Sequence, residues 1–259
     1  MSYALVTGAS GGIGWALASE LASRKHDVLL LARSEATLKK NSQELRDKHG
    51  VKADYLVIDL SVQDSPVKVK DWLQQKGYDI DILINNAGFA TWGPLRDLKR
   101  EELNQMMQLN MVTLADLCKL LLPDLEKNKK AYILNISSTT AYQSIPTLAT
   151  YAASKAFVLL FSRGLRLELK GGPVSVTCVS PGTTTSGFMH RANMGPLKQK
   201  AEKLTMDASV VAKMSIDGMY ACKPEVIPGF VNWTTAKLVQ LLPKVLPELI
   251  AKNIYKTDK

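Results

Sequence analysis

The stretch that decides the fold is TGASGGIG, residues 7–14. It follows the apolar run Ala4–Thr7 and precedes a segment whose apolar residues have helical spacing. Glycine lets the backbone turn tightly and approach a pyrophosphate closely, and the N-terminus of the next helix offers free N–H groups to an anion. The Gly-x3-Gly-x-Gly spacing differs from the usual dinucleotide fingerprint, and such a turn can need glycine for packing alone. Its place between the first strand and the first helix favours phosphate binding.

Short apolar runs recur along the chain, each followed by a stretch of helical character. Runs rich in Val, Ile and Leu indicate strands that are buried on both faces. The predicted strands are Ala4–Thr7, Val28–Ala32, Tyr55–Asp59, Ile80–Ile84, Tyr132–Ile136, Val174–Val179 and Val226–Gly229, and the clearest later helices are Thr37–His49, Leu103–Leu125 and Ala153–Leu169. This alternation predicts an α/β fold in a single domain over residues 1–259: a Rossmann-type, doubly wound parallel sheet of about seven strands with helices on both faces.

Composition and charge narrow the classes of protein. The 259 residues are 46% hydrophobic, which is enough to bury a large core. Three cysteines (Cys118, Cys178 and Cys222) lie far apart without metal-ligand spacing, so we expect free thiols and no metal. With no secretory signal pattern and no run of roughly 20 apolar residues, we expect a soluble, cytoplasmic protein. The net charge of +9 is scattered, which favours a solvated surface over nucleic-acid binding.

The end of the second predicted strand indicates which dinucleotide the chain prefers. NAD-binding units carry an Asp or Glu there for the ribose 2′-hydroxyl, whereas an Arg suits a 2′-phosphate. Here the sequence is Leu31-Ala32-Arg33-Ser34, with no carboxylate at that place. We therefore expect NADPH/NADP+ as the cofactor, although Arg33 could also be an ordinary surface residue.

Three side chains are candidates for the chemistry. Tyr151 and Lys155 are spaced to share one helix face, where an ammonium would lower the pKa of the phenol toward neutrality. A Tyr-x3-Lys pair alone is common by chance. Ser138 strengthens the case because it follows the fifth predicted strand, where its hydroxyl could bond a carbonyl oxygen as negative charge develops.

Together with further motifs, these residues make nearly the whole chain resemble the short-chain dehydrogenase/reductase family. The motifs that carry the resemblance are Thr7-Gly8-x3-Gly12-x-Gly14, Asp59-Leu60, Asn85-Asn86-Ala87-Gly88, Asn110, Ser138, Tyr151-x3-Lys155 and Pro181-Gly182, in the family's order and spacing. One departure is Ser186, where family members commonly have Thr; a hydroxyl is retained.

The resemblance implies a role for each matching residue. Tyr151 would be the general acid in reduction, Ser138 would polarise the carbonyl, Lys155 would tune Tyr151 and bond the nicotinamide ribose, and Asn110 would hold a water that links Lys155 to solvent. The implied cofactor-binding residues are Gly8, Ser10, Gly11, Gly12, Ile13, Gly14, Arg33, Asp59, Leu60, Asn86, Ala87, Gly88, Tyr151, Lys155, Pro181, Gly182, Thr183 and Thr184. The implied activity is hydride transfer between NADPH and a carbonyl or alcohol, in a homodimer or homotetramer.

The C-terminal third is the variable part. Residues 184–220 are expected to contain the substrate lid, because in the family the segment after the sixth strand does so. Residues 231–259 form a helical extension with apolar residues at helical spacing, interrupted by Pro243 and Pro247. The extension could pack on its own domain or on a partner subunit, which we favour because of the prolines, or rest on a membrane surface. It resembles a subgroup related to long-chain 3-ketoacyl and 17β-hydroxysteroid enzymes, which suggests an apolar substrate.

Two other functions compete with an NADPH-dependent reductase. An NADP(H)-binding sensor or scaffold would have no need for all of Asn110, Ser138, Tyr151 and Lys155. An NAD-linked dehydrogenase working in the oxidative direction is disfavoured by Arg33.

Overall fold

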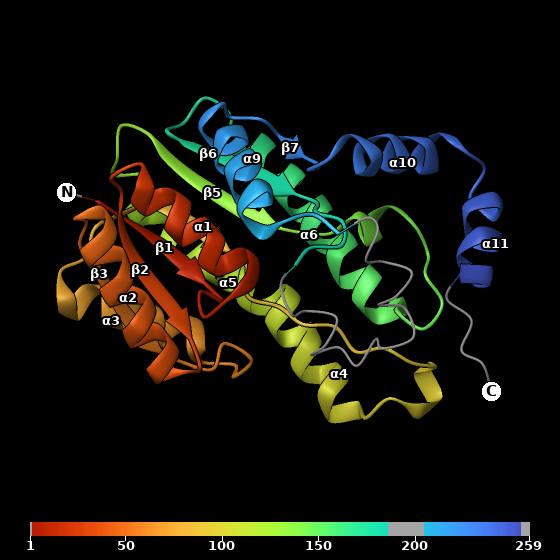
Figure 1. The fold of residues 1–259 in the computed structure, drawn as a ribbon, viewed down its shortest axis with the longest axis horizontal. Coiled ribbons are helices and arrows are strands. Elements are labelled where there is room, and N and C mark those ends of the chain that lie inside the picture. Colours follow the sequence, from red (N-terminus) through yellow and green to blue (C-terminus); the bar gives the residue numbers. More distant parts are fainter. Residues whose placement is uncertain (1, 186–204, 255–259) are drawn as a thin grey trace.

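The structure is a computed structural model that describes residues 2–185 and 205–254. Its centre is a sheet of seven strands, all parallel, in the order β3-β2-β1-β4-β5-β6-β7 (Figure 1). The strands are β1 (Tyr3–Thr7), β2 (Asp27–Ala32), β3 (Ala53–Val57), β4 (Ile80–Asn85), β5 (Ala131–Ile136), β6 (Val174–Val179) and β7 (Glu225–Val226). The winding reverses between β1 and β4, and this reversal is where such sheets bind ligands.

Helices cover both faces of the sheet, as predicted. One face carries α1 (Gly12–Ser23), α2 (Glu35–His49) and α9 (Ala208–Tyr220); the other carries α3 (Ser65–Lys76), α5 (Leu114–Leu125) and α6 (Ala149–Glu168). Successive residues of a strand point to opposite faces, so Leu30 packs in one core while Leu29 and Leu31 pack in the other. This double burial explains why the strands are apolar throughout and show no alternation.

Several predicted elements differ from the observed ones; α6, for example, begins at Ala149, four residues before the predicted start at Ala153. The third strand lies at Ala53–Val57, two residues before the predicted Tyr55–Asp59, so Asp59 is in the following loop. The predicted helix Leu103–Leu125 is divided into α4 (Arg100–Met107), a π-helical segment η2 (Gln108–Thr113) and α5. The seventh strand ends at Val226 because Pro228 has no N–H to donate and Gly229, with φ +89°, begins the turn into the next helix.

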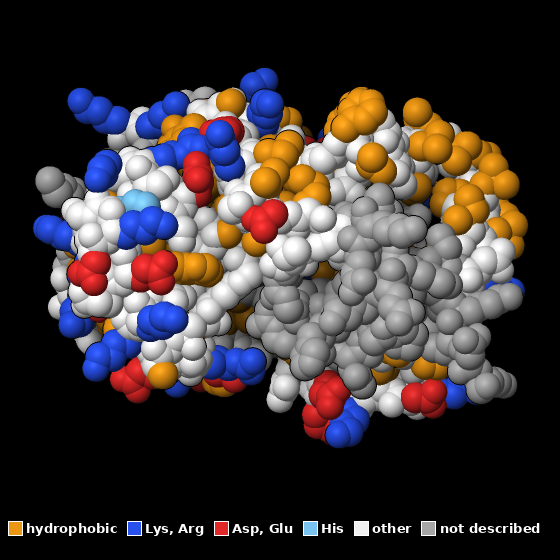
Figure 2. All heavy atoms as spheres, in the orientation of Figure 1, with side chains coloured by type: hydrophobic (Ala, Val, Ile, Leu, Met, Phe, Trp, Pro, Cys, Tyr) orange, Lys and Arg blue, Asp and Glu red, His pale blue; other side chains and the backbone are white. Residues whose placement is uncertain are grey.

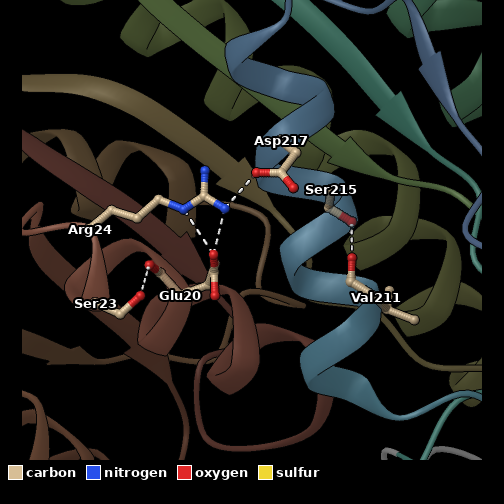
Figure 3. A network of polar contacts seen from close by, with 6 residues as sticks. All are labelled: Glu20, Ser23, Arg24, Val211, Ser215 and Asp217. Carbon is tan, nitrogen blue, oxygen red and sulfur yellow. Dashed lines mark hydrogen bonds and ion pairs between the residues drawn. The ribbon is translucent and has the colours of Figure 1, made fainter.

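Helix α9 belongs to the layer that covers the sheet. Arg24, directly after α1, donates to Asp217 of α9 at 2.6 Å and also to Glu20 of α1 (Figure 3). At Gly218 a Cβ atom would lie 2.2 Å from Cγ2 of Val226, so the close contact between α9 and β7 needs glycine. Residues 208–220 of the predicted lid region therefore pack on the sheet, and residues 186–204 lie outside the described part of the chain.

The C-terminal extension forms two helices, α10 (Phe230–Leu241) and α11 (Val245–Ile254). They extend beyond the last strand, away from β1–β3 (Figure 1). Pro243 lies in the link between them and Pro247 lies in the first turn of α11, where a missing N–H costs little. The prolines thus separate two helices rather than break one. Within the described ranges, no helix combines the length and the apolarity that crossing a membrane requires.

Candidate active site

A cleft of about 1010 Å³ opens at the carboxyl ends of the strands. Of the predicted cofactor-binding residues, all except Gly12 line it. Ser138, Tyr151 and Lys155 also line it, whereas Asn110 is 1% exposed and lies behind its wall. The fold therefore brings together residues from loops that are more than a hundred positions apart in the sequence.

Glycine is required at two positions of the turn after β1. Gly8 has φ +68°, a conformation that side chains rarely adopt, and a Cβ there would lie 2.8 Å from Nδ2 of Asn86. At Gly14 a Cβ would lie 2.3 Å from the carbonyl oxygen of Gly8. A Cβ at Gly11 would have no other atom within 4 Å, so the turn faces open space in front of α1. No side chain caps the start of α1, which leaves its N–H groups available to an anion.

The buried Thr7 hydroxyl joins the ends of β1 and β4 at the point where the winding reverses. It donates to the carbonyl of Ile84 at 3.1 Å and accepts from the N–H groups of Asn86 at 2.9 Å and Ala87 at 3.0 Å. The Asn86 side chain donates in return to the carbonyl of Thr7 at 2.9 Å. These bonds hold the glycine turn next to the Asn86–Gly88 loop. One hydroxyl thus fixes the relative position of two segments that line the cleft.

The loops after β2 and β3 supply one guanidinium and one carboxylate. The Arg33 side chain is 75% exposed, and its Nη1 atom lies 3.9 Å from Oδ2 of Asp59. Burial alone would raise the pKa of Asp59, but hydrogen bonds from the N–H and hydroxyl of Ser61, together with the Arg33 charge, hold that pKa below its usual value. The open glycine turn and the exposed Arg33, with no carboxylate directly after β2, fit a dinucleotide that carries a 2′-phosphate.

Tyr151, Lys155 and Ser138 meet at the inner end of the cleft. Tyr151 and Lys155 are on α6, and the Lys155 Nζ atom lies 5.8 Å from the centre of the Tyr151 ring. Lys155 also donates to the carbonyl of Ile136, the last residue of β5, at 2.9 Å. Ser138, two residues further on, hydrogen bonds the Tyr151 side chain. A carbonyl oxygen placed between Ser138 and Tyr151 would be within reach of two hydroxyl groups.

Burial is the largest influence on the pKa values of Tyr151 and Lys155. It raises the pKa of Tyr151 above the ordinary value for a phenol, and the hydrogen bond with Ser138 only partly offsets this. Burial also lowers the pKa of Lys155, to about 8. The expectation that Lys155 brings the Tyr151 pKa down toward neutrality is wrong, because the desolvation of the buried phenol raises its pKa. A phenol that keeps its proton at pH 7 suits a general acid.

Asn110 acts on the shape of the cleft through the loop after β4. It lies in the π-helical segment η2, a distortion that is frequent at functional sites. Its side chain exchanges two hydrogen bonds with the backbone of Phe89, at 3.0 and 3.2 Å, and donates to the Ser154 hydroxyl at 3.1 Å. A Cβ at Gly88 would lie 2.9 Å from Oδ1 of Asn110. The water relay expected of Asn110 stays a prediction.

Sequence reasoning missed the wall that α10 contributes. Its cleft-lining residues are Val231, Asn232, Thr235, Ala236 and Val239. Asn232 reaches the loop after β6, where a Cβ at Gly182 would lie 2.5 Å from its Oδ1. The spacing of these five residues indicates one helix face, but nothing in the sequence showed that the face turns toward the site. The predicted Pro181–Thr184 loop lines the cleft next to Asn232, and Ser186 is outside the described residues.

The comparisons with known proteins agree with this geometry. Residues 2–196 match a family model described as short chain dehydrogenase. The very-long-chain 3-oxoacyl-CoA reductase of Anas platyrhynchos is 31% identical over 271 residues, with 100% of this chain and 84% of the relative covered. The protein of the same name from Rattus norvegicus is 34% identical over 183 residues, which cover 69% of this chain and 58% of the relative. A solved short-chain dehydrogenase from Sphingobium yanoikuyae, in complex with NADPH, aligns with a TM-score of 0.81 at 28% identity, covering 94% of this chain and 96% of that one.

Proposed function

The chain belongs to the short-chain dehydrogenase family, and from that premise we propose that it reduces an apolar carbonyl substrate with NADPH. It is an oxidoreductase that acts on CH–OH and C=O groups. The observation that carries the proposal is that Ser138, Tyr151 and Lys155 converge in the same cleft as the open glycine turn and Arg33. A module that only binds the nucleotide has no need for that convergence.

NADPH would lie along the cleft and supply the hydride. At its adenosine end, Arg33 would bind the 2′-phosphate, while the N-terminus of α1 would face the pyrophosphate. At its nicotinamide end, the Pro181–Thr184 loop would bind the carboxamide and Lys155 would bind the ribose hydroxyls. Residues in these positions would hold the dinucleotide with its reactive ring toward Tyr151.

The protein's own contribution to the chemistry is control of one proton. Ser138 would donate a hydrogen bond to the substrate carbonyl oxygen and fix its position. Tyr151, whose raised pKa keeps the phenol protonated, would pass its proton to that oxygen as the hydride reaches the carbon. The phenolate left behind would be stabilised by the Lys155 ammonium. The exclusion of water from this buried end of the cleft strengthens each of these interactions.

The apolar substrate is inferred from the cleft wall. Phe89, Leu109, Leu148, Val231 and Val239 line the cleft together with the polar groups described above. Apolar walls with a few placed polar groups are typical of sites for small apolar molecules. The names of the duck and rat relatives point to long-chain 3-oxoacyl compounds, which also carry a ketone on an apolar chain.

The test is the oxidation of NADPH in the presence of a panel of ketones and aldehydes of increasing chain length. We expect turnover that rises with the apolarity of the substrate. Tyr151→Phe should lower kcat by about a hundredfold or more, because the proton donor is lost. Tyr132→Phe is the matched control, since Tyr132 is equally buried at 7% exposure but lies outside the cleft lining. Binding of NADPH without turnover of any carbonyl would instead support a sensor or scaffold.

We also propose that the protein works in the cytoplasm, since its three cysteines are free thiols, two of them buried. A homodimer or homotetramer stays a prediction.

A further inference from the structure

The two C-terminal helices expose large apolar side chains that nothing in the described chain covers. On α10, Phe230 is 79% exposed and Leu241 is 84% exposed, and Trp233 and Leu238 are exposed as well. Such side chains gather over α10 and α11 in the space-filling view, whereas charged side chains dominate the surface over β1–β3 and their helices (Figure 2). A contiguous apolar patch at one end of a molecule marks an interaction site.

Helix α10 has one face toward the cleft and an apolar face toward solvent. Asn232, Ala236 and Val239 are on the face that lines the cleft. With 3.6 residues per turn, Phe230, Leu238 and Leu241 fall on the opposite face, and Trp233 lies beside them. The Phe230 and Trp233 rings stack on each other with their centres 6.3 Å apart. A helix that had only to close the cleft would not need an apolar outer face.

Helix α11 repeats this arrangement. Pro247 and Ala251 are buried, and Val245, Leu246, Leu249 and Ile250 are exposed on the other side. Helix α11 is held to the loop after β5 by a hydrogen bond from the Ser144 hydroxyl to Glu248 at 3.1 Å. We call the exposed apolar side chains of both helices together the outer face.

The charges around the outer face favour an anionic surface. In the described parts of α10, α11 and their link, the charged residues are Lys237, Lys244, Lys252 and Glu248. Lys237 lies 4.0 Å from Glu225, which leaves Lys244 and Lys252 as the lysines without an ion pair in the described chain. Lysines beside an apolar helix face, with exposed Trp and Phe, are the composition of helices that lie in a membrane interface. Each lysine near an anionic lipid surface adds to the attraction.

A second copy of the chain fits this face less well. In a two-fold symmetric dimer the same patch meets itself, so the lysines of one copy would approach the lysines of the other. In the described chain the two helices and their link carry one carboxylate, Glu248, against three lysines, so a second copy offers little opposite charge. An anionic bilayer offers an apolar layer and opposite charge at once.

We propose that the outer face of α10 and α11 docks the protein on the surface of an anionic phospholipid bilayer. The helices lie in the interface without crossing it. One consequence rests on the proposed function: because the inner face of α10 lines the cleft, docking places the site next to the membrane, where lipophilic carbonyl compounds dissolve.

Cosedimentation of the full chain with vesicles tests the proposal. We expect binding to vesicles of phosphatidylglycerol and phosphatidylcholine in equal parts, weaker binding to pure phosphatidylcholine, and release as salt is added. Leu241→Gln combined with Leu249→Gln should weaken binding by about tenfold or more, because two leucines no longer enter the apolar layer. Replacing Lys244 and Lys252 by Gln should cost about fivefold for each lysine on the anionic vesicles.

The control is Val67→Gln, an exposed apolar residue of α3 at the other end of the molecule, which should bind like the wild type. Circular dichroism and thermal melting verify that each variant is folded. No binding to anionic vesicles would overturn the proposal. So would binding that Leu241→Gln with Leu249→Gln leaves unchanged. A dimer in ultracentrifugation that this pair of substitutions dissociates, without vesicle binding by the wild type, would assign the face to a second copy. None of these readouts depends on the proposed reaction.

Discussion

Lys155 lies 5.8 Å from the centre of the Tyr151 ring, one turn away on α6, and donates its hydrogen bond to the Ile136 carbonyl. Both residues are at most 7% exposed, so the charged form of each, the Tyr151 phenolate or the Lys155 ammonium, is poorly solvated. Tyr151 therefore keeps its proton more strongly than a free phenol, and Lys155 loses its proton more easily than a free amine.

The rate of reduction should fall as the pH rises through about 8, the pKa of Lys155. Below that pH the ammonium stabilises the phenolate that Tyr151 becomes after it gives up its proton. Above that pH Lys155 is a neutral amine and cannot stabilise the phenolate, so kcat declines although Tyr151 is still protonated. The measurement is kcat for NADPH oxidation against pH with saturating substrate. A flat profile from pH about 7 to about 10 would remove the Lys155 charge from the mechanism.

Replacing Lys155 by Met should stabilise the protein at pH 7. The pKa is about 8 in the folded chain and near 10.5 in the unfolded one, so folding must bury a charge that the unfolded chain carries in water. This penalty is fully present below pH 8 and is relieved as the pH rises from about 8 toward 10.5. We expect a gain of about 2 kcal/mol in the free energy of unfolding at neutral pH, since the lost hydrogen bond to Ile136 offsets part of it.

Urea denaturation at pH about 7 and about 9.5 checks this prediction. The advantage of Lys155→Met should shrink at the higher pH, whereas Lys129→Met, at an exposed position, should change little at either pH. A Lys155→Met protein that is less stable than the wild type at pH 7 would show that the ammonium stabilises the fold.

Arg33→Ala should reduce the preference for NADPH. A guanidinium bound to a 2′-phosphate is a charge-assisted contact, so its loss should raise KM for NADPH by about tenfold to a hundredfold and change KM for NADH little. Arg163→Ala, an exposed arginine of α6 outside the cleft lining, is the control. Equal effects on both dinucleotides would mean that Arg33 does not read the 2′-phosphate.

Thr7→Val should destabilise the protein by about 2–4 kcal/mol. The change keeps the volume but leaves the buried N–H groups of Asn86 and Ala87 without their acceptor. The Kd for NADPH should rise as well, because the same bonds align the glycine turn with the Asn86–Gly88 loop. Thr7→Ser restores the hydroxyl and should recover most of both losses. Thermal melts and NADPH fluorescence titration measure the two effects, and a Thr7→Ser protein as impaired as Thr7→Val would show that the methyl group matters instead.

The sequence determined the sheet and most of the cleft. Parallel strands buried on both faces need unbroken apolar runs, and these runs marked the strands to within a few residues; Val174–Val179 was predicted with its observed limits. Because such a sheet binds ligands beyond its strand ends, the sequence alone predicts that the glycine turn, Arg33 and Ser138 lie at one edge. Local spacing also put Tyr151 and Lys155 on one helix face.

Only the tertiary structure decided how those residues behave. The pKa values of Tyr151 and Lys155 depend on the depth to which α6 is buried, and spacing alone suggested the opposite direction for Tyr151. The π-helical segment around Asn110 and the orientation of α10, with one face toward the cleft, depend on contacts with distant loops, which the local sequence does not encode. The prolines favoured packing of residues 231–259 on the domain itself or on a partner subunit, and this stays a prediction. In the described chain one face of α10 lines the cleft and an apolar face is left exposed. Helical spacing shows which residues share a face, but not what covers that face.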